Sequence, residues 1–203
     1  MTVKFYEGER IYLRPLELSD EPQLRQWINH PDNWRTLGRV FPCNEVRERE
    51  WIEKLYASRE DIALGIIVKE GDRLVGSAGL LEINPVNRSA VFGILIGDLE
   101  YQSRGYGTEA TRLMVKLAFE EFNLNRVELS VFASNPRGIK AYERAGFVFE
   151  GRARQAYFRG GRYVDELRYA ILRSDWEPNQ ALQAETVESA HALETAVPAS
   201  LAV

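Results

Sequence analysis

A glycine-containing segment between an apolar run and an amphipathic stretch carries the strongest chemical signal in the sequence. It spans residues 102–108 and reads Gln-Ser-Arg-Gly-Tyr-Gly-Thr. Backbone N–H groups at the start of a helix lack intrahelical partners, and the helix dipole favours an anion there, so phosphate is the natural ligand of such a loop. Arg104 adds a positive charge at the same place. The segment therefore predicts a binding site for a phosphate-bearing molecule.

Three other interpretations of this segment are weaker. A P-loop would need a lysine, which Gly107-Thr108-Glu109 lacks. The spacing of Gly105, Gly107 and Ala110 fits a dinucleotide-binding fingerprint, with Glu128 about 20 residues further on. In that fold the acid ends its strand, whereas Glu128 begins one, and the preceding elements read as hairpins. A glycine turn without a ligand is the third interpretation.

A second segment, residues 135–147, places basic and aromatic groups on one expected helix. Arg137, Lys140 and Arg144 recur at spacings that bring them within about 60° of one another around the helix axis. Such a stripe could contact a phosphate, although a solvated helix face is the alternative. Tyr142 points to the opposite side, toward the expected sheet.

Together the two segments resemble the signature motifs of the GNAT acetyltransferases. Gln102–Gly107 matches Gln/Arg-x-x-Gly-x-Gly/Ala, and Asn135–Phe147 matches Asn-x-x-(small/Ile)-x-x-x-Tyr-x-x-x-Gly-Phe. The resemblance covers about residues 10–176. Leu81–Asn84 and Phe158–Tyr163 are similar to the branch that holds ribosomal-protein N-terminal acetyltransferases and spermidine acetyltransferases. The resemblance implies an α+β fold with a mixed, mostly antiparallel central sheet flanked by helices.

The resemblance implies that acetyl-CoA binds as a co-substrate. Its pyrophosphate would contact the amides of residues 103–108, and its pantetheine arm would pair with the exposed edge of the strand at 94–96. Asn135 would cap its helix and also hydrogen-bond the pantetheine. The residues expected to bind the cofactor are Ile94, Leu95, Ile96, Gln102, Ser103, Arg104, Gly105, Tyr106, Gly107, Thr108, Asn135, Arg137 and Lys140.

The reaction implied by the resemblance is direct attack of a primary amine on the thioester, with the oxyanion held by a backbone N–H near Ile94. Tyr142 would be the general acid that protonates the leaving thiolate, and a core aromatic is the alternative. An alkylammonium must lose a proton before it attacks, so a base is needed. Glu82 is the expected base; Asp98, Glu100 or a relay through water are the alternatives.

The acceptor amine is less determined. In this family the Trp34–Cys43 loop and the first two helices cover the acceptor side, and acids beside aromatics suit a cationic amine. The acids and aromatics of that region are Asp32, Glu45, Glu48, Glu50, Trp34, Phe41 and Trp51. A small polyamine, a peptide N-terminus or an amino sugar would fit. A non-catalytic acyl-CoA-binding regulatory module is the alternative function, although such a module would not need an acid at Tyr142.

Apolar patterning and turn residues predict the framework that positions these groups. Its order is β-α-α-β-β-β-α-β-α-β-β. Expected strands are residues 10–16, 62–69, 74–83, 89–97, 126–132, 147–157 and 162–172; expected helices start near 19, 44, 108 and 136. The run at 89–97 is nearly continuous in apolar residues, which predicts a central strand covered on both faces.

Length and composition indicate one globular domain, residues 1–176, followed by a flexible Ala/Glu-rich tail, residues 177–203. The formal net charge of −4 gives no general reason to bind nucleic acid or a membrane. Because Cys43 is the lone cysteine, no intramolecular disulfide can form. With one cysteine and only two histidines in the chain, a metal site is not expected. Without a leader or a membrane-spanning run, a cytoplasmic protein is expected.

The final hairpin, Phe147–Leu172, carries aromatics at Tyr157, Tyr163 and Tyr169. We expect these side chains to be exposed and to pair two copies of the chain, which predicts a homodimer.

Overall fold

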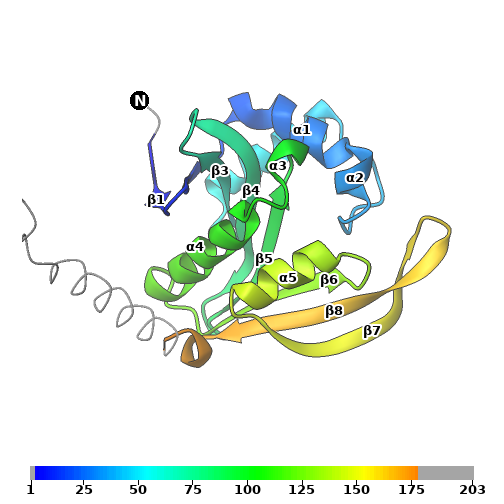
Figure 1. Cartoon of the computed structure of the whole chain (residues 1–203). Coiled ribbons are helices and arrows are strands. Elements are labelled where there is room, and N and C mark those ends of the chain that lie inside the picture. The colour runs from blue at the N-terminus through cyan, green and yellow to red at the C-terminus, as the bar shows by residue number, and fades with distance from the viewer. Residues whose placement is uncertain (1–2, 178–203) are drawn as a thin grey trace, which may run out of the picture.

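A mixed eight-stranded sheet forms the centre of the protein, with helices on both faces (Figure 1). The computed structural model describes residues 3–177. The strand order is β1-β2-β3-β4-β5-β6-β8-β7, and all neighbours are antiparallel except β5 and β6. The strands are β1 (Tyr6–Glu7), β2 (Ile11–Pro15), β3 (Ile62–Val68), β4 (Arg73–Asn84), β5 (Ser89–Ile96), β6 (Arg126–Phe132), β7 (Val148–Arg159) and β8 (Arg162–Leu172). The helices are α1 (Glu21–Asn29), α2 (Pro31–Trp34), α3 (Glu45–Ala57), α4 (Tyr106–Glu120) and α5 (Pro136–Arg144), with 3-10 turns η1 (Leu18–Asp20) and η2 (Leu99–Tyr101).

The predicted α+β fold with a mostly antiparallel sheet is confirmed, and so are the main predicted strands and helices. The sequence did not predict β1, η1, η2 or the single turn of α2. That turn follows directly on α1 because His30 adopts an extended backbone and Pro31 restarts the helix.

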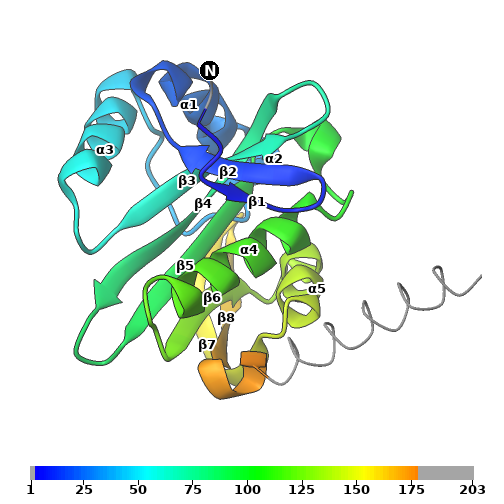
Figure 2. The same ribbon diagram turned by 90° about the vertical axis from the view of Figure 1, so that its left-hand side faces the viewer.

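Each face of the sheet has its own helical cover (Figure 2). Helix α4 packs its apolar stripe on one face with α5 beside it, and Met114 and Leu117 are fully buried there. On the other face Trp27 of α1 and Ile52 of α3 pack against Leu16. Burial of each large apolar side chain contributes about 1.5–3 kcal/mol, so both helix layers are firmly held.

The parallel pairing of β5 and β6 is short, and the two strands separate in the middle of the sheet. β5 and β6 pair only from Ser89 to Val91, after which the two strands separate. Only Ala90 and Phe92 of β5 are fully buried, and residues 93–96 are half-buried. The expectation that this strand is covered on both faces is therefore wrong for its second half, where β4 still pairs with it but β6 does not.

The aromatic side chains of the β7–β8 hairpin are less exposed than expected. Tyr169 is buried, at 4% exposure, and Tyr157 packs against Phe132 with ring centroids 4.9 Å apart. Tyr163 alone of the three expected residues is exposed. Strand β7 lies at the edge of the sheet, and its exposed apolar side chains at Val148 and Phe149 were not expected.

The described residues were also expected to contain neither a membrane-spanning segment nor a metal site. No helix within residues 3–177 combines the length and apolarity needed to cross a membrane. The same residues contain no cluster of three or more His, Cys, Asp or Glu side chains that could hold a metal ion. The tail predicted from residue 177 onward lies, but for Glu177, outside the described residues.

Candidate active site

A cavity of about 450 Å³ lies between the separated end of β5, the start of α4 and helix α5. It brings together both sequence segments that predicted phosphate binding. Its lining consists of Thr36, Ile94, Leu95, Ile96, Gln102, Ser103, Gly105, Gly107, Thr108, Thr111, Asn135, Pro136, Arg137, Gly138, Lys140, Ala141, Tyr142 and Arg144. Of the residues expected to bind the cofactor, Arg104 and Tyr106 alone do not line this cavity.

The start of α4 has the features of an anion site. Gly105 precedes the helix with φ +89°, a left-handed conformation that favours glycine, and no side chain caps the helix. The first amides of the helix therefore have no side-chain cap on the cavity side, where Gly107 and Thr108 form the wall.

Arg10 supports this loop from behind, which sequence reasoning missed. Its Nη1 donates to the carbonyl of Arg104 at 3.0 Å, and its Nε donates to Glu109 at 3.1 Å. Its guanidinium also lies 4.8 Å from the ring centroid of Tyr106. Tyr106 therefore packs behind the loop rather than facing the cavity. Arg104 likewise turns away, with its guanidinium 5.6 Å from the ring of Tyr101.

Gln102 joins three elements at the cavity. Its amide NH₂ donates to the Asn33 side chain at 2.9 Å and to the carbonyl of Ile96 at 2.7 Å. Its amide oxygen accepts from Arg137 at 2.5 Å. Asn33 is 1% exposed and donates in turn to the carbonyl of Gly97. The glutamine therefore fixes the end of β5, helix α2 and helix α5 relative to one another.

Helix α5 supplies the positive wall of the cavity. Asn135 caps the helix by accepting from the amide of Gly138 at 3.0 Å, which confirms its expected capping role. Arg137, Lys140 and Arg144 are exposed and line the cavity, as the helical spacing predicted. The basic stripe can therefore contact an anion bound in the cavity.

Tyr142 lies on the cavity wall with its ring in the core. The ring contacts Phe92 and Phe147 edge-on at centroid distances of 6.3 and 6.1 Å. Burial raises the pKa of Tyr142 to about 12. The hydroxyl is therefore protonated at neutral pH and can donate a proton or a hydrogen bond.

Comparison with known proteins supports what this geometry indicates. Residues 10–148 match the family described as "Acetyltransferase (GNAT) domain". The chain belongs to the GNAT acetyltransferase family. Members of this family use acetyl-CoA as the acetyl donor, and the two motifs, the helix start and the basic wall all lie around one cavity.

Relatives of this GNAT acetyltransferase cover nearly all of its described part. A putative ribosomal N-acetyltransferase, YdaF of Bacillus subtilis, is 32% identical over 84% of this chain and 95% of its own length. The spermidine N(1)-acetyltransferase of Vibrio cholerae is 29% identical over 83% of this chain and 96% of its own. The structure of a Vibrio cholerae spermidine N-acetyltransferase with CoA and spermine superposes with a TM-score of 0.78 at 27% identity, covering 83% of this chain and 99% of the other.

The expected base of this GNAT acetyltransferase, Glu82, lies outside the cavity. It is exposed and follows Leu81 in an irregular stretch of β4, with φ +53°. The register pairs Leu81 with Val91 but Gly76 with Ile96, so Glu82 and the cavity-lining end of β5 are at opposite ends of the strand pair. Glu82 thus lies on the strand next to β5, as expected, but not among the residues that line the cavity, and its role as the base stays a prediction.

The alternative acids do not line the cavity either. Asp98 accepts from Arg73 at 2.8 Å and from the amide of Glu100, which caps η2. Glu100 is exposed. No carboxylate is among the residues that line the cavity.

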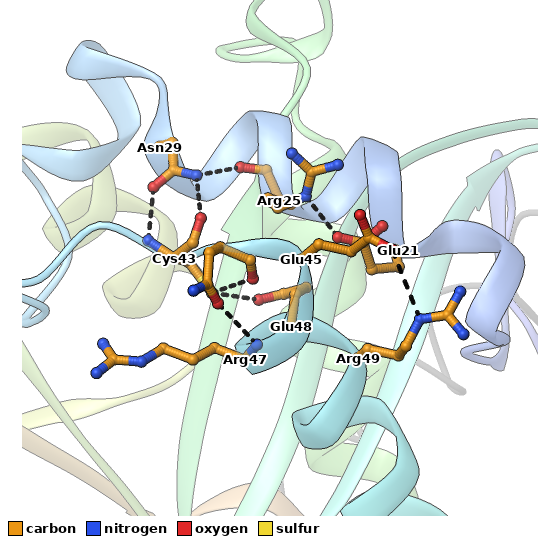
Figure 3. Close-up of polar contacts among 9 residues, drawn as sticks. Glu21, Arg25, Asn29, Cys43, Glu45, Arg47, Glu48 and Arg49 are labelled. Carbon is orange, nitrogen blue, oxygen red and sulfur yellow. Dashed lines mark hydrogen bonds and ion pairs between the residues drawn. The ribbon is translucent and has the colours of Figure 1, made fainter.

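The acids expected on the acceptor side differ in their environments, and Figure 3 shows Glu45 and Glu48 of α3 together with Glu21 of α1. Glu48 is 2% exposed and accepts from the Cys43 thiol, with a distance of 3.1 Å between Sγ and Oε2. Glu21 is also buried and pairs with Arg25 at 2.5 Å, whereas Glu45 lies on the outer surface of α3, 4.0 Å from Arg49. Glu48 is therefore withdrawn from the surface, whereas Asp32, Glu45 and Glu50 are exposed.

Cys43 is buried, and its environment makes it a poor nucleophile. Burial and the neighbouring Glu48 carboxylate raise the pKa of its thiol to about 11. The thiolate is therefore scarce at neutral pH, and this cysteine serves the packing of α3.

Proposed function

We propose that this protein transfers the acetyl group of acetyl-CoA to a primary amine by direct attack within a ternary complex. One observation carries the proposal. A protonated tyrosine hydroxyl, that of Tyr142, lies on the wall of the same cavity that holds an uncapped helix start and three basic side chains. An anion site and a proton donor in one cavity suit a reaction that expels a thiolate from a phosphate-bearing donor.

The binding roles follow from where each group lies. The amides at the start of α4 would hold the pyrophosphate of acetyl-CoA, and Arg137 and Lys140 would contact its 3′-phosphate. The edge of β5 at residues 94–96 has no partner strand on the β6 side, so its backbone groups can pair with the amides of a pantetheine arm. Acetyl-CoA supplies the thioester at this edge.

Tyr142 would act as the general acid. A neutral phenol beside the sulfur can hydrogen-bond the departing thiolate and transfer its proton. A backbone N–H near Ile94 would stabilise the oxyanion that forms when the amine attacks the thioester carbon. Because no carboxylate lines the cavity, we propose that the proton of the acceptor ammonium leaves through water.

An acetyl-transfer assay separates this enzyme from a regulatory module that only binds acyl-CoA. Purified protein is incubated with acetyl-CoA and a panel of amines, and free thiol is measured with time. The panel holds spermidine, an amino sugar and short peptides with free N-termini. Amine-dependent thiol release is expected with at least one acceptor. Saturable acetyl-CoA binding without thiol release from any amine would contradict the proposed function.

We also propose that the protein forms a homodimer through the free edge at the start of β7, around Val148 and Phe149, outside residues 151–168. Val148 and Phe149 are 56% and 51% exposed at the start of this edge strand. Exposed apolar side chains on an unpaired edge favour pairing with a second strand. A structural relative from Vibrio cholerae, with a TM-score of 0.71, is described as dodecameric. Light scattering should give twice the mass of one chain, and a monomer mass at micromolar concentration would contradict the dimer.

A further inference from the structure

The loop after α2 and the tip of the β7–β8 hairpin form one continuous surface beside the cavity. Arg159, at the end of β7, donates from Nη2 to the carbonyls of Leu37 and Arg39 at 3.3 and 3.1 Å. Its guanidinium lies 5.9 Å from the ring centroid of Trp34. Thr36, in the same loop, lines the cavity. The joined surface therefore borders the cavity at the Thr36 end, and Figure 1 shows the hairpin curving toward α2.

This joined surface is rich in arginine. We call it the arginine rim and define it as residues 34–42 and 151–168. The arginine rim contains seven arginines, no lysine and two acids, so its net charge is +5 in a chain with a formal net charge of −4. Its arginines are Arg35, Arg39, Arg152, Arg154, Arg159, Arg162 and Arg168, and its acids are Asp165 and Glu166.

Much of this charge is not neutralised within the protein. Asp165 pairs with Arg152, Glu166 lies 3.5 Å from Arg168, and Arg35 lies 3.7 Å from Asp32 of α2, just outside the rim. Three further arginines of the rim are exposed and make no ion pair within 4 Å in the described part of the chain. These are Arg39, Arg154 and Arg162. Of the acids that sequence analysis placed near this side, Glu48 is buried against the Cys43 thiol, and Glu45 lies 4.0 Å from Arg49 of its own helix (Figure 3).

Apolar side chains are exposed among these arginines. Val40 and Phe41 in the loop are 59% and 73% exposed, and Phe158 and Tyr163 at the hairpin tip are 57% and 65% exposed. Arginine and aromatic residues are enriched at protein–protein interfaces, where they carry much of the binding energy. A surface of this composition suits a polypeptide better than a small polar molecule.

We propose that the arginine rim binds an acidic polypeptide whose N-terminal amine enters the cavity as the acetyl acceptor. This inference rests on the proposed function and narrows its acceptor class. Guanidinium groups bind carboxylates in bidentate geometry and remain charged at all physiological pH values. The same net positive charge repels a polyamine as it approaches the cavity, so a polycationic acceptor is disfavoured.

The test reverses exposed charges that support no described contact. In the double variant Arg154→Glu/Arg162→Glu, the Michaelis constant for a short acidic peptide with a free N-terminus should rise at least ~10-fold, because attraction becomes repulsion. The Michaelis constants for acetyl-CoA and for a neutral peptide of the same length should stay within about two-fold. The matched control Lys54→Glu/Arg59→Glu changes the net charge equally on exposed residues away from the arginine rim, and it should leave all three constants unchanged.

A binding measurement keeps this test separate from the proposed function. The acidic peptide, labelled at its C-terminus, is titrated with the wild-type protein in the presence of CoA, and its fluorescence anisotropy is recorded. Salt-sensitive binding that the rim variant loses and the control keeps supports the inference, even if no amine is acetylated. Three results would overturn it: equal affinity for acidic and neutral peptides, tighter binding of single-stranded RNA than of the acidic peptide, or a change of oligomeric mass in the rim variant. The last result would assign the arginine rim to a second copy of the chain.

Discussion

The hydroxyl of Tyr142 combines two environments, and this combination defines its chemistry. Its ring is held by Phe92 and Phe147, whereas the side chain also forms part of the cavity wall. Burial disfavours the charged phenolate, so the pKa rises to about 12 from about 10 in an exposed tyrosine. The group is therefore ready to donate a proton throughout the physiological pH range.

The raised pKa of Tyr142 predicts the shape of the pH–rate profile. The rate should rise with pH as the acceptor amine loses its proton, and Tyr142 should cause no falling limb below about pH 11. Stability, in contrast to the rate, falls as the pH rises from about 10 to 12, because the unfolded chain loses the Tyr142 proton before the folded one does. Initial rates with saturating acetyl-CoA give the profile, and a falling limb near pH 8–9 that Tyr142→Phe abolishes would contradict this account.

Substitution of Glu82 tests how the acceptor ammonium loses its proton. Its exposed position at the far end of β4 gives it no contact with the cavity. The variant Glu82→Gln should therefore keep kcat and both Michaelis constants within about two-fold of the wild type. Steady-state kinetics with a good acceptor check this, and a loss of kcat by 100-fold or more would show that Glu82 is the base despite its place in this structure.

At the scale of elements, the start of α4 is the part of the site that depends most on backbone shape. Gly105 holds a left-handed conformation, and a Cβ atom there would lie 3.0 Å from Nη2 of Arg10. A branched residue would therefore strain the loop and displace the amides that face the cavity. Gly71, in the β3–β4 turn, has a similar φ of +79° but open space around it.

This pair of glycines gives a controlled test of the anion site. Acetyl-CoA at about 100 times its dissociation constant should stabilise the wild type by about 2.7 kcal/mol, which corresponds to a rise in Tm of several degrees. Gly105→Val should lose this rise, whereas Gly71→Val should keep it although both variants melt lower without ligand. Differential scanning fluorimetry measures both. An unchanged rise in Gly105→Val would remove the loop from the binding site.

At the scale of the whole molecule, the site is made from segments that the chain brings together from far apart. Residues 102–108 and 135–147 were predictable because each motif lies in one short stretch with its own turn and helix signals. The place of Thr36 in the cavity lining and the hydrogen bond from Gln102 to Asn33 could not be predicted, since both depend on how α2 packs against the end of β5. The distance of Glu82 from the cavity could not be predicted either, because the register of β4 against β5, rather than sequence distance, sets its position.

The same reasoning explains the acceptor side. Composition alone made the region around residues 32–51 look acidic, but Glu48 is buried against the Cys43 thiol and Asp32 lies 3.7 Å from Arg35. The arginines of the hairpin tip reach the loop after α2 only through the long curved β7 and β8. Which charges face an acceptor is therefore a property of the assembled fold.

The central claim is that Tyr142 supplies a proton to the leaving thiolate in this cavity. The most direct test is kcat for Tyr142→Phe, with the Michaelis constant for acetyl-CoA and Tm measured on the same protein. Loss of the hydroxyl alone should lower kcat by roughly 10²–10⁴-fold and leave the Michaelis constant and Tm nearly unchanged, because the ring keeps its packing against Phe92 and Phe147. A Phe variant whose kcat stays within a few-fold of the wild type would contradict the claim and leave Tyr142 as a core aromatic.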